Sequence, residues 1–225
     1  MNDNQQEQIW DCIHIFAKTF DPYKTDERES FVCFFECLCD LLPSNELRSW
    51  FATFLTSNPP QNHTTSQNDA FAWSCKLHTY IILCERKQGK STQIITLDKL
   101  SDKYKLITRE DWSNAIWFVL HFFTSNLPQQ ITPQIFESVK AFCVCLMDLL
   151  PCPKCKAHMK TYLAQHPIDM CKSGSDLFRW TCEYHFEVNS FDQKNQPPMD
   201  LKKLYSFYHI FLKQQTSSSF EYIDE

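Results

Sequence analysis

Glycine is scarce in this chain of 225 residues, which contains only 2 Gly beside 11 Pro. Folds built from β-strands need many turns, and turns are rich in glycine, so the composition favours helices. The chain has no run of lysine or arginine, and its net charge of −5 gives no electrostatic footprint for nucleic acid. Its apolar runs, such as residues 117–123, are far too short to cross a bilayer.

Cysteine and phenylalanine, in contrast, are abundant, with 12 Cys and 19 Phe. A cysteine-rich chain is first suspected to be a secreted disulfide scaffold. The first eight residues, however, have neither the basic start nor the apolar core of a signal peptide. We therefore expect an intracellular protein with a large buried core, made without a secretory signal.

The chain also contains an internal repeat, because residues 9–82 align with residues 116–189 at an offset of 107 or 108. The matching positions include two Trp, two His and a Cys in the same order: Trp10, His14, Trp73, Cys75 and His78 match Trp117, His121, Trp180, Cys182 and His185. A repeat of this length is longer than the units of solenoid proteins, so it indicates a duplicated domain.

The hydrophobic pattern predicts four helices in the second copy, at 110–126, 133–150, 153–166 and 174–190, and a further amphipathic helix at 200–214. We expect a first domain at 1–88, a linker at 89–104, a second domain at 105–214 and a tail at 215–225. In the first domain Ser44 and Leu47 replace Cys152 and Cys155. The first copy therefore keeps the residues expected to build the helical scaffold and lacks the cysteine pair that would carry the chemistry.

The pair Cys152-Pro-Lys-Cys155 stands at the start of a predicted helix, directly after Pro151. A Cys-x-x-Cys pair is either a redox-active dithiol or half of a metal site. Unpaired backbone N–H groups carry partial positive charge at a helix start, which stabilises a thiolate, and Lys154 and Lys156 add to this charge.

Two further sets of residues share helix faces. Cys182, His185 and Asn189 lie at i, i+3 and i+7, while Trp117 and His121 lie at i and i+4. Flat rings and an amide on facing helices would form a slot for a planar heterocycle. Each residue alone is better explained by core packing, but the joint pattern around a Cys-x-x-Cys pair favours a site.

Together, Trp117-x-x-x-His121, Cys152-x-x-Cys155 and Trp180-x-Cys182-x-x-His185-x-x-Val188-Asn189 resemble the Erv/ALR family of FAD-dependent sulfhydryl oxidases. The resemblance covers residues 113–199 and implies an all-α fold with FAD and no metal. It also implies which residues bind the cofactor, with Lys194 at the phosphates: Trp117, His121, Cys182, His185, Val188, Asn189 and Lys194.

The resemblance implies the reaction as well. Cys155 should lie against the flavin, while Cys152 faces outward and takes electrons from a protein dithiol, and oxygen is then reduced to hydrogen peroxide. The chain departs from the family pattern at two places. Ser113 and Asn114 stand where a Gly-Arg pair is usual, and Met199 stands where Cys182 would find its disulfide partner.

The repeat and the resemblance together predict two tandem bundles of four to five helices that pack as a pseudo-dimer, with only the C-terminal bundle active. Baculoviral members of the family also carry an active and a degenerate bundle. We therefore expect a protein of a large DNA virus, acting in the cytoplasm of the infected cell and in the virion. A further homodimer stays open as an alternative.

Other interpretations remain. Cys152, Cys155, Cys182 and His185 form a legitimate Cys₃His ligand set for a zinc-binding interaction module, although zinc knuckles usually need Gly-rich turns and only Gly174 lies in this interval. A structural protein that has lost its activity is a third reading.

The remaining cysteines have two readings as well. Buried packing is the first, and a thiol shuttle to Cys152 is the second. The lone shuttle candidate is Cys171, and the others are Cys143 and Cys145 in the second copy and Cys33, Cys37 and Cys39 in the first.

Overall fold

The structure is a computed structural model that describes residues 3–90, 96–192 and 199–209, and within these ranges it contains helices and no strands. The predicted all-α class is confirmed. The helices of the first half are α1 (Asp3–Thr19), α2 (Thr25–Leu41), α3 (Asn45–Ser57), α4 (Gln67–Lys87) and α5 (Leu97–Lys103). Those of the second half are α6 (Arg109–Ser125), α7 (Pro133–Leu149), α8 (Pro153–Gln165), α9 (Gly174–Phe191) and α10 (Leu201–Tyr208).

The four helices predicted for the second copy are confirmed to within one residue at each end. Their starts are capped by side chains, because Thr108, Thr132 and Ser173 each accept a hydrogen bond from the backbone N–H three residues later. At the start of α9, a Cβ atom on Gly174 would lie 2.6 Å from the carbonyl oxygen of Pro128. Only glycine allows this close approach of the two backbones.

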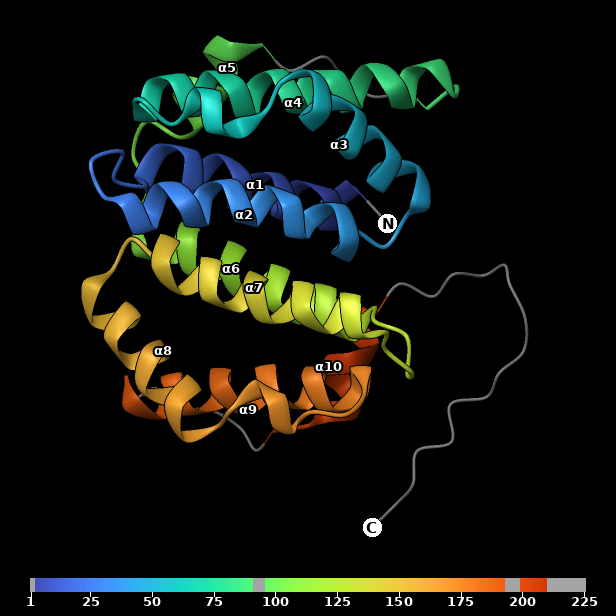
Figure 1. Cartoon of the computed structure of the whole chain (residues 1–225), viewed down its shortest axis with the longest axis vertical. Coiled ribbons are helices and arrows are strands. Elements are labelled where there is room, and N and C mark those ends of the chain that lie inside the picture. The colour runs from blue at the N-terminus through green and yellow to red at the C-terminus, as the bar shows by residue number, and fades with distance from the viewer. Residues whose placement is uncertain (1–2, 91–95, 193–198, 210–225) are drawn as a thin grey trace.

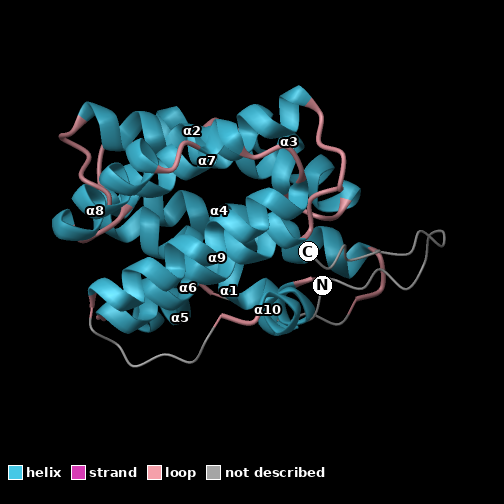
Figure 2. Cartoon of the chain, turned by 90° about the horizontal axis from the view of Figure 1, so that it is seen from below, coloured by secondary structure: helices cyan, strands magenta, loops and turns pink. Residues whose placement is uncertain are grey.

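The two halves are stacked on each other, as Figure 1 shows. Helices α1 and α2 of the first half face α6 and α7 of the second, and the pair α2–α7 makes the most extensive helix contact among the described residues. Helices α3 to α5 cover one end of the stack and α8 to α10 the other, and Figure 2 shows the same helices from below.

Contacts between α2 and α7 are reciprocal. The hydroxyl of Ser30 donates to Asp148 at 2.7 Å, and the hydroxyl of Ser138 donates to Asp40 at 2.5 Å. At the repeat offset of 108, Ser30 is equivalent to Ser138 and Asp40 to Asp148, so the two bonds are equivalent to each other. Phe34 and Phe142 are also equivalent positions, and their rings stack with centroids 5.6 Å apart. The two repeat copies therefore present equivalent residues to each other in these contacts.

The stretch 89–104, predicted as a linker, contains helix α5. Leu100 and Tyr104 are buried, and the Tyr104 ring lies 5.3 Å from the ring of His14. Tyr208 of α10 lies 5.0 Å from His121 in the same way. These ring contacts attach α5 to the first half as α10 is attached to the second, so each half has five α-helices within the described residues. The domain boundaries themselves stay predictions.

The C-terminal predictions are tested only in part. Helix α10 lies within the helix predicted at 200–214, while residues 210–225, with the predicted tail, lie outside the described residues. Within the described ranges, no helix combines the length and apolar character needed to cross a membrane.

Candidate functional site

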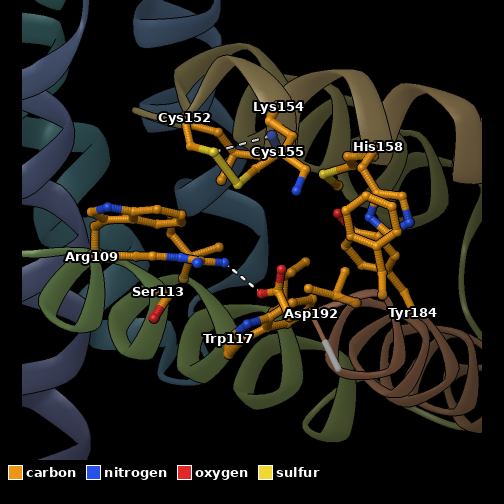
Figure 3. Close-up of a pocket in the computed structure, with 16 residues that line it drawn as sticks. Arg109, Ser113, Trp117, Cys152, Lys154, Cys155, His158, Tyr184 and Asp192 are labelled. Carbon is orange, nitrogen blue, oxygen red and sulfur yellow. Dashed lines mark hydrogen bonds and ion pairs between the residues drawn. A yellow bond between two sulfur atoms is a disulfide. The ribbon is translucent and has the colours of Figure 1, made fainter. Parts of the chain in front are cut away.

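A cavity of about 340 Å³ lies between α6, α8 and α9. Cys152 and Cys155 lie on one wall, with Trp117 and Val188 among the residues that complete the lining (Figure 3). This volume lies in the range of small-molecule sites, which are mostly apolar with a few polar groups.

The two cysteines of the pair form a disulfide, with their Cα atoms 5.2 Å apart. Cys152 is the N-cap of α8, and its Sγ accepts a hydrogen bond from the backbone N–H of Cys155 at 3.2 Å. The predicted position at a helix start is therefore confirmed. Cys155 packs against the hydrophobic core, which makes it the inner member of the pair.

The two lysines beside the pair have different surroundings. Lys154 lines the cavity, with its Nζ 4.7 Å from the centre of the Phe191 ring. Lys156 instead reaches the first half, where its Nζ lies 2.6 Å from Oε1 of Glu27. Burial alone would raise the pKa of Glu27, but the hydrogen bonds from Lys156 and from the backbone of Asp21 lower it. The charge of Lys156 is therefore engaged between the halves, and only Lys154 faces the cavity.

Behind the cavity, Trp117 and two histidines form a stack. The rings of Trp117 and His185 are 3.9 Å apart and within 5° of parallel. Nδ1 of His185 lies 2.9 Å from Nε2 of His121. These rings pack on one another, so the expected slot for a planar group does not lie between them. The cavity is lined by Trp117 and not by either histidine.

The hydrogen bonds of His121 determine its tautomer. The hydroxyl of Thr181 donates to the carbonyl of Phe178, so it accepts a hydrogen bond from Nδ1–H of His121. Burial lowers the pKa of His121 to about 3, with a smaller contribution from His185. The neutral ring then accepts at Nε2 from His185, and this chain of bonds holds His185 flat against Trp117.

The structure divides the predicted site residues into two groups. Cys152, Cys155, Trp117 and Val188 line the cavity. The others do not: His121 and Cys182 are buried, while His185 and Asn189 are partly buried. Lys194 lies outside the described residues.

Cys182 lies deep in the second half, with its Sγ 3.9 Å from Nδ1 of His121. Burial raises its pKa to about 12, so the thiol stays protonated and serves as packing behind the histidine. Its expected contact with FAD stays a prediction.

Sequence reasoning did not single out several residues that line the cavity. Arg109 pairs with Asp192 at 2.5 Å, and His158 stacks on Phe191 with centroids 4.7 Å apart (Figure 3). Helical spacing could have found two of them, because Arg109 lies eight residues before Trp117, on the same face of α6, and His158 lies three residues after Cys155 on α8.

Comparison with known proteins shows similarity to one family. The model of the Erv1 / Alr family matches residues 114–209. An FAD-linked sulfhydryl oxidase ERV1 of Arabidopsis thaliana is 28% identical over 151 residues, which are 65% of this chain and 73% of that protein. The protein of the same description from Oryza sativa subsp. japonica is 28% identical over 91 residues, 40% of this chain and 46% of its own. These findings support the predicted oxidoreductase class and FAD as its cofactor.

The cavity has residues that fit a flavin. Trp117 and Tyr184 supply aromatic walls close to the disulfide, and the cations Arg109 and Lys154 lie on the lining where they can meet an anionic group. A zinc site fits less well. Cys152 and Cys155 are joined to each other, and the described part of the chain contains no group of three or more His, Cys, Asp or Glu side chains arranged to hold a metal ion.

The first half repeats the ring stack of the Erv1 / Alr region. Trp10 and His78 are 3.8 Å apart, and Nε2 of His14 lies 3.0 Å from Nδ1 of His78. At the positions equivalent to Cys155 and Met159, Leu47 and Phe51 are both buried, and Phe51 packs 5.9 Å from Trp10. Trp10, His14, Trp73 and His78 are all buried core residues.

Among the shuttle candidates outside the pair, Cys171 and Cys143 are buried, whereas Cys33 and Cys39 are partly exposed. Cys171 follows a short 3₁₀ turn and is 9% exposed, and burial raises its pKa to about 11. Burial likewise raises the pKa of Cys143 to about 12. Neither thiol has the thiolate character or exposure that a shuttle needs, so both are better described as packing residues in this conformation.

Proposed function

We propose that this chain is an FAD-linked sulfhydryl oxidase that forms disulfides in protein substrates. The observation that carries the proposal is the Cys152–Cys155 disulfide on the wall of a cavity that Trp117 also lines, within the region that the Erv1 / Alr model matches. The chemistry that FAD supplies when bound is the transfer of two electrons from a thiol pair to molecular oxygen, which yields hydrogen peroxide.

The disulfide would be reduced by two successive exchange steps. A substrate thiolate attacks Sγ of Cys152, which breaks the bond to Cys155 and leaves a mixed disulfide. The second substrate thiol then attacks this mixed disulfide, so the substrate leaves oxidised and both cysteines are reduced. Cys155 packs against the core, so Cys152 is the member of the pair that we assign to the substrate.

Trp117 and Tyr184 would hold the planar ring of the cofactor beside Cys155. The hydrogen-bonded chain from Thr181 through His121 to His185 would keep the Trp117 ring in place. Arg109 and Lys154 would balance the negative charge of the cofactor phosphates.

We also propose that the two halves form an internal pseudo-dimer in which only the second is active. The reciprocal hydrogen bonds of Ser30 and Ser138 and the Phe34–Phe142 stack support this arrangement. In the first half, the buried residues Leu47 and Phe51 occupy the positions equivalent to Cys155 and Met159 on the cavity wall.

The setting of the reaction is a separate proposal. The resemblance to baculoviral members of the family favours a chain from a large DNA virus that acts on virion proteins inside the infected cell. Thiols there otherwise stay reduced, so disulfides would need a dedicated oxidase.

Oxygen consumption with dithiothreitol tests the proposed oxidase. Purified chain should show a flavin absorbance band, and Cys155→Ser should lower the rate by about three orders of magnitude while the flavin stays bound. Cys152→Ser should lose activity on a protein dithiol to a similar degree. Cys84→Ser, a partly buried thiol of the first half, is the matched control and should keep the rate. A colourless protein with one zinc per chain would favour the zinc-binding module instead.

A further inference from the structure

Three thiols meet where the two halves join, and none of them lines the cavity. Cys33 and Cys37 both lie on α2, with their Sγ atoms 3.9 Å apart. The side chain of Cys145 of α7 is close enough to influence the ionisation of both of them. All three are free thiols in this structure.

The register of the two helices places Cys33 opposite Cys145. Ser30 bonds to Asp148, and ten residues later on α2, Asp40 bonds to Ser138, ten residues earlier on α7. The two helices therefore run antiparallel. Each next residue along α2 lies opposite the residue one position earlier in α7. Cys33 is three residues after Ser30, and Cys145 is three residues before Asp148.

The duplication leaves this pair without a symmetric copy. With the repeat offset of 108, Cys33 is equivalent to Ala141 and Cys145 is equivalent to Cys37. The second place where a bond could form between the halves therefore pairs Cys37 with Ala141, which has no sulfur. In this register Cys33 is the thiol that stands opposite Cys145, and the equivalent place opposite Cys37 offers no thiol.

The three thiols differ in access and in acidity. Cys33 is partly exposed, whereas Cys37 and Cys145 are buried. Hydrogen bonds from Cys145 and Cys37 lower the pKa of Cys33, while the same contacts raise the pKa of Cys145. Cys33 is therefore the thiol that a molecule from solvent can reach, and the thiolate is the nucleophile in disulfide exchange.

We propose that Cys33 and Cys145 form a disulfide that joins the two halves of the chain. The oxidant is a small-molecule disulfide. The thiolate of Cys33 attacks one of its sulfurs, which forms a mixed disulfide and releases one small thiol. Cys145 gives up its proton and attacks Sγ of Cys33, which forms the protein disulfide and releases the second small thiol. Two protein thiols are thus oxidised while one small disulfide is reduced.

Disulfide mapping of the full-length protein after treatment with oxidised glutathione tests this proposal. After free thiols are alkylated, trypsin with Glu-C and Asp-N isolates Cys33 in a peptide of residues 30–36 and Cys145 in a peptide of residues 141–147. We expect these two peptides to be joined by a bond that a reductant breaks. The melting temperature should rise by about 5–15 °C, because the bond closes a long loop in the unfolded chain.

Cysteine variants identify which cysteine of each peptide forms the bond. Cys33→Ser should abolish the joined peptide. Cys39→Ser should retain it and is the control, because Cys39 is a partly buried thiol of the same helix whose Sγ donates to the carbonyl of Phe35. Cys143→Ser should also retain it, since Cys143 shares the peptide with Cys145. The proposal is overturned if Cys33 and Cys145 of the wild-type chain are both alkylated after oxidation, or if the bond joins Cys37 or Cys143 instead. The wild-type measurement needs no variant to fold, and neither outcome depends on flavin or oxidase activity.

Discussion

Mild acid should destabilise this protein through its buried histidines. Burial lowers the pKa of His78 and of His121 to about 3, with smaller contributions from Lys103 and His185 respectively. In the unfolded chain a histidine titrates near pH 6.5. Between these values the unfolded state binds more protons than the folded state, so the free energy of unfolding falls as the pH falls.

The two pKa values determine the size of the effect. Between pH 6.5 and pH 5, each of these histidines removes about 1.6 kcal/mol from the free energy of unfolding, and the two together remove about 3 kcal/mol. Burial lowers the pKa of His14 as well, which adds to the loss. Carboxylates with lowered pKa, such as Glu27 and Asp176, lose their contribution only at lower pH, so this window isolates the histidines.

Urea unfolding at pH 6.5 and at pH 5 measures the difference, with the linear slope on urea checked for each condition. His78→Gln and His121→Gln should each reduce the pH dependence by about a third, because His14 and the other histidine still contribute, even though each variant also loses a hydrogen bond. His166→Gln is the control, because its ring lies on the surface, and it should leave the dependence unchanged. Equal unfolding free energies at the two pH values, to within about 0.5 kcal/mol, would refute the reasoning.

Three further predictions concern the interface and the first half. Phe34→Ala removes half of the stacked pair between α2 and α7 and should cost about 3–5 kcal/mol by urea unfolding, whereas Phe207→Ala, 67% exposed, should cost far less. The ratio of flavin to chain in pure protein should be close to one; a ratio near two would contradict an inactive first half. Trp117→Ala should release flavin, while the equivalent change Trp10→Ala should destabilise the first half and leave the flavin of the folded protein in place, as absorbance after gel filtration will show.

Local signals were enough to predict much of this structure. Helix starts at 133 and 153 follow from caps and from proline at the first turn, which act over three or four residues. The repeat of Trp and His positions predicted equivalent ring stacks, because the same sequence spacing on the same helices brings the same rings together. The position of the Cys152–Cys155 pair at a helix start was predicted for the same reason.

What only the tertiary structure decided depends on contacts between distant segments. The sequence suggested a slot between Trp117 and the histidines, but packing between α6 and α9 presses these rings together and leaves the cavity against α8. It also suggested a linker at 89–104, where the burial of Leu100 and Tyr104 produces a fifth helix. The engagement of Lys156 by Glu27 could not be read from the chain, because those residues lie far apart in sequence and meet only when the two halves pack.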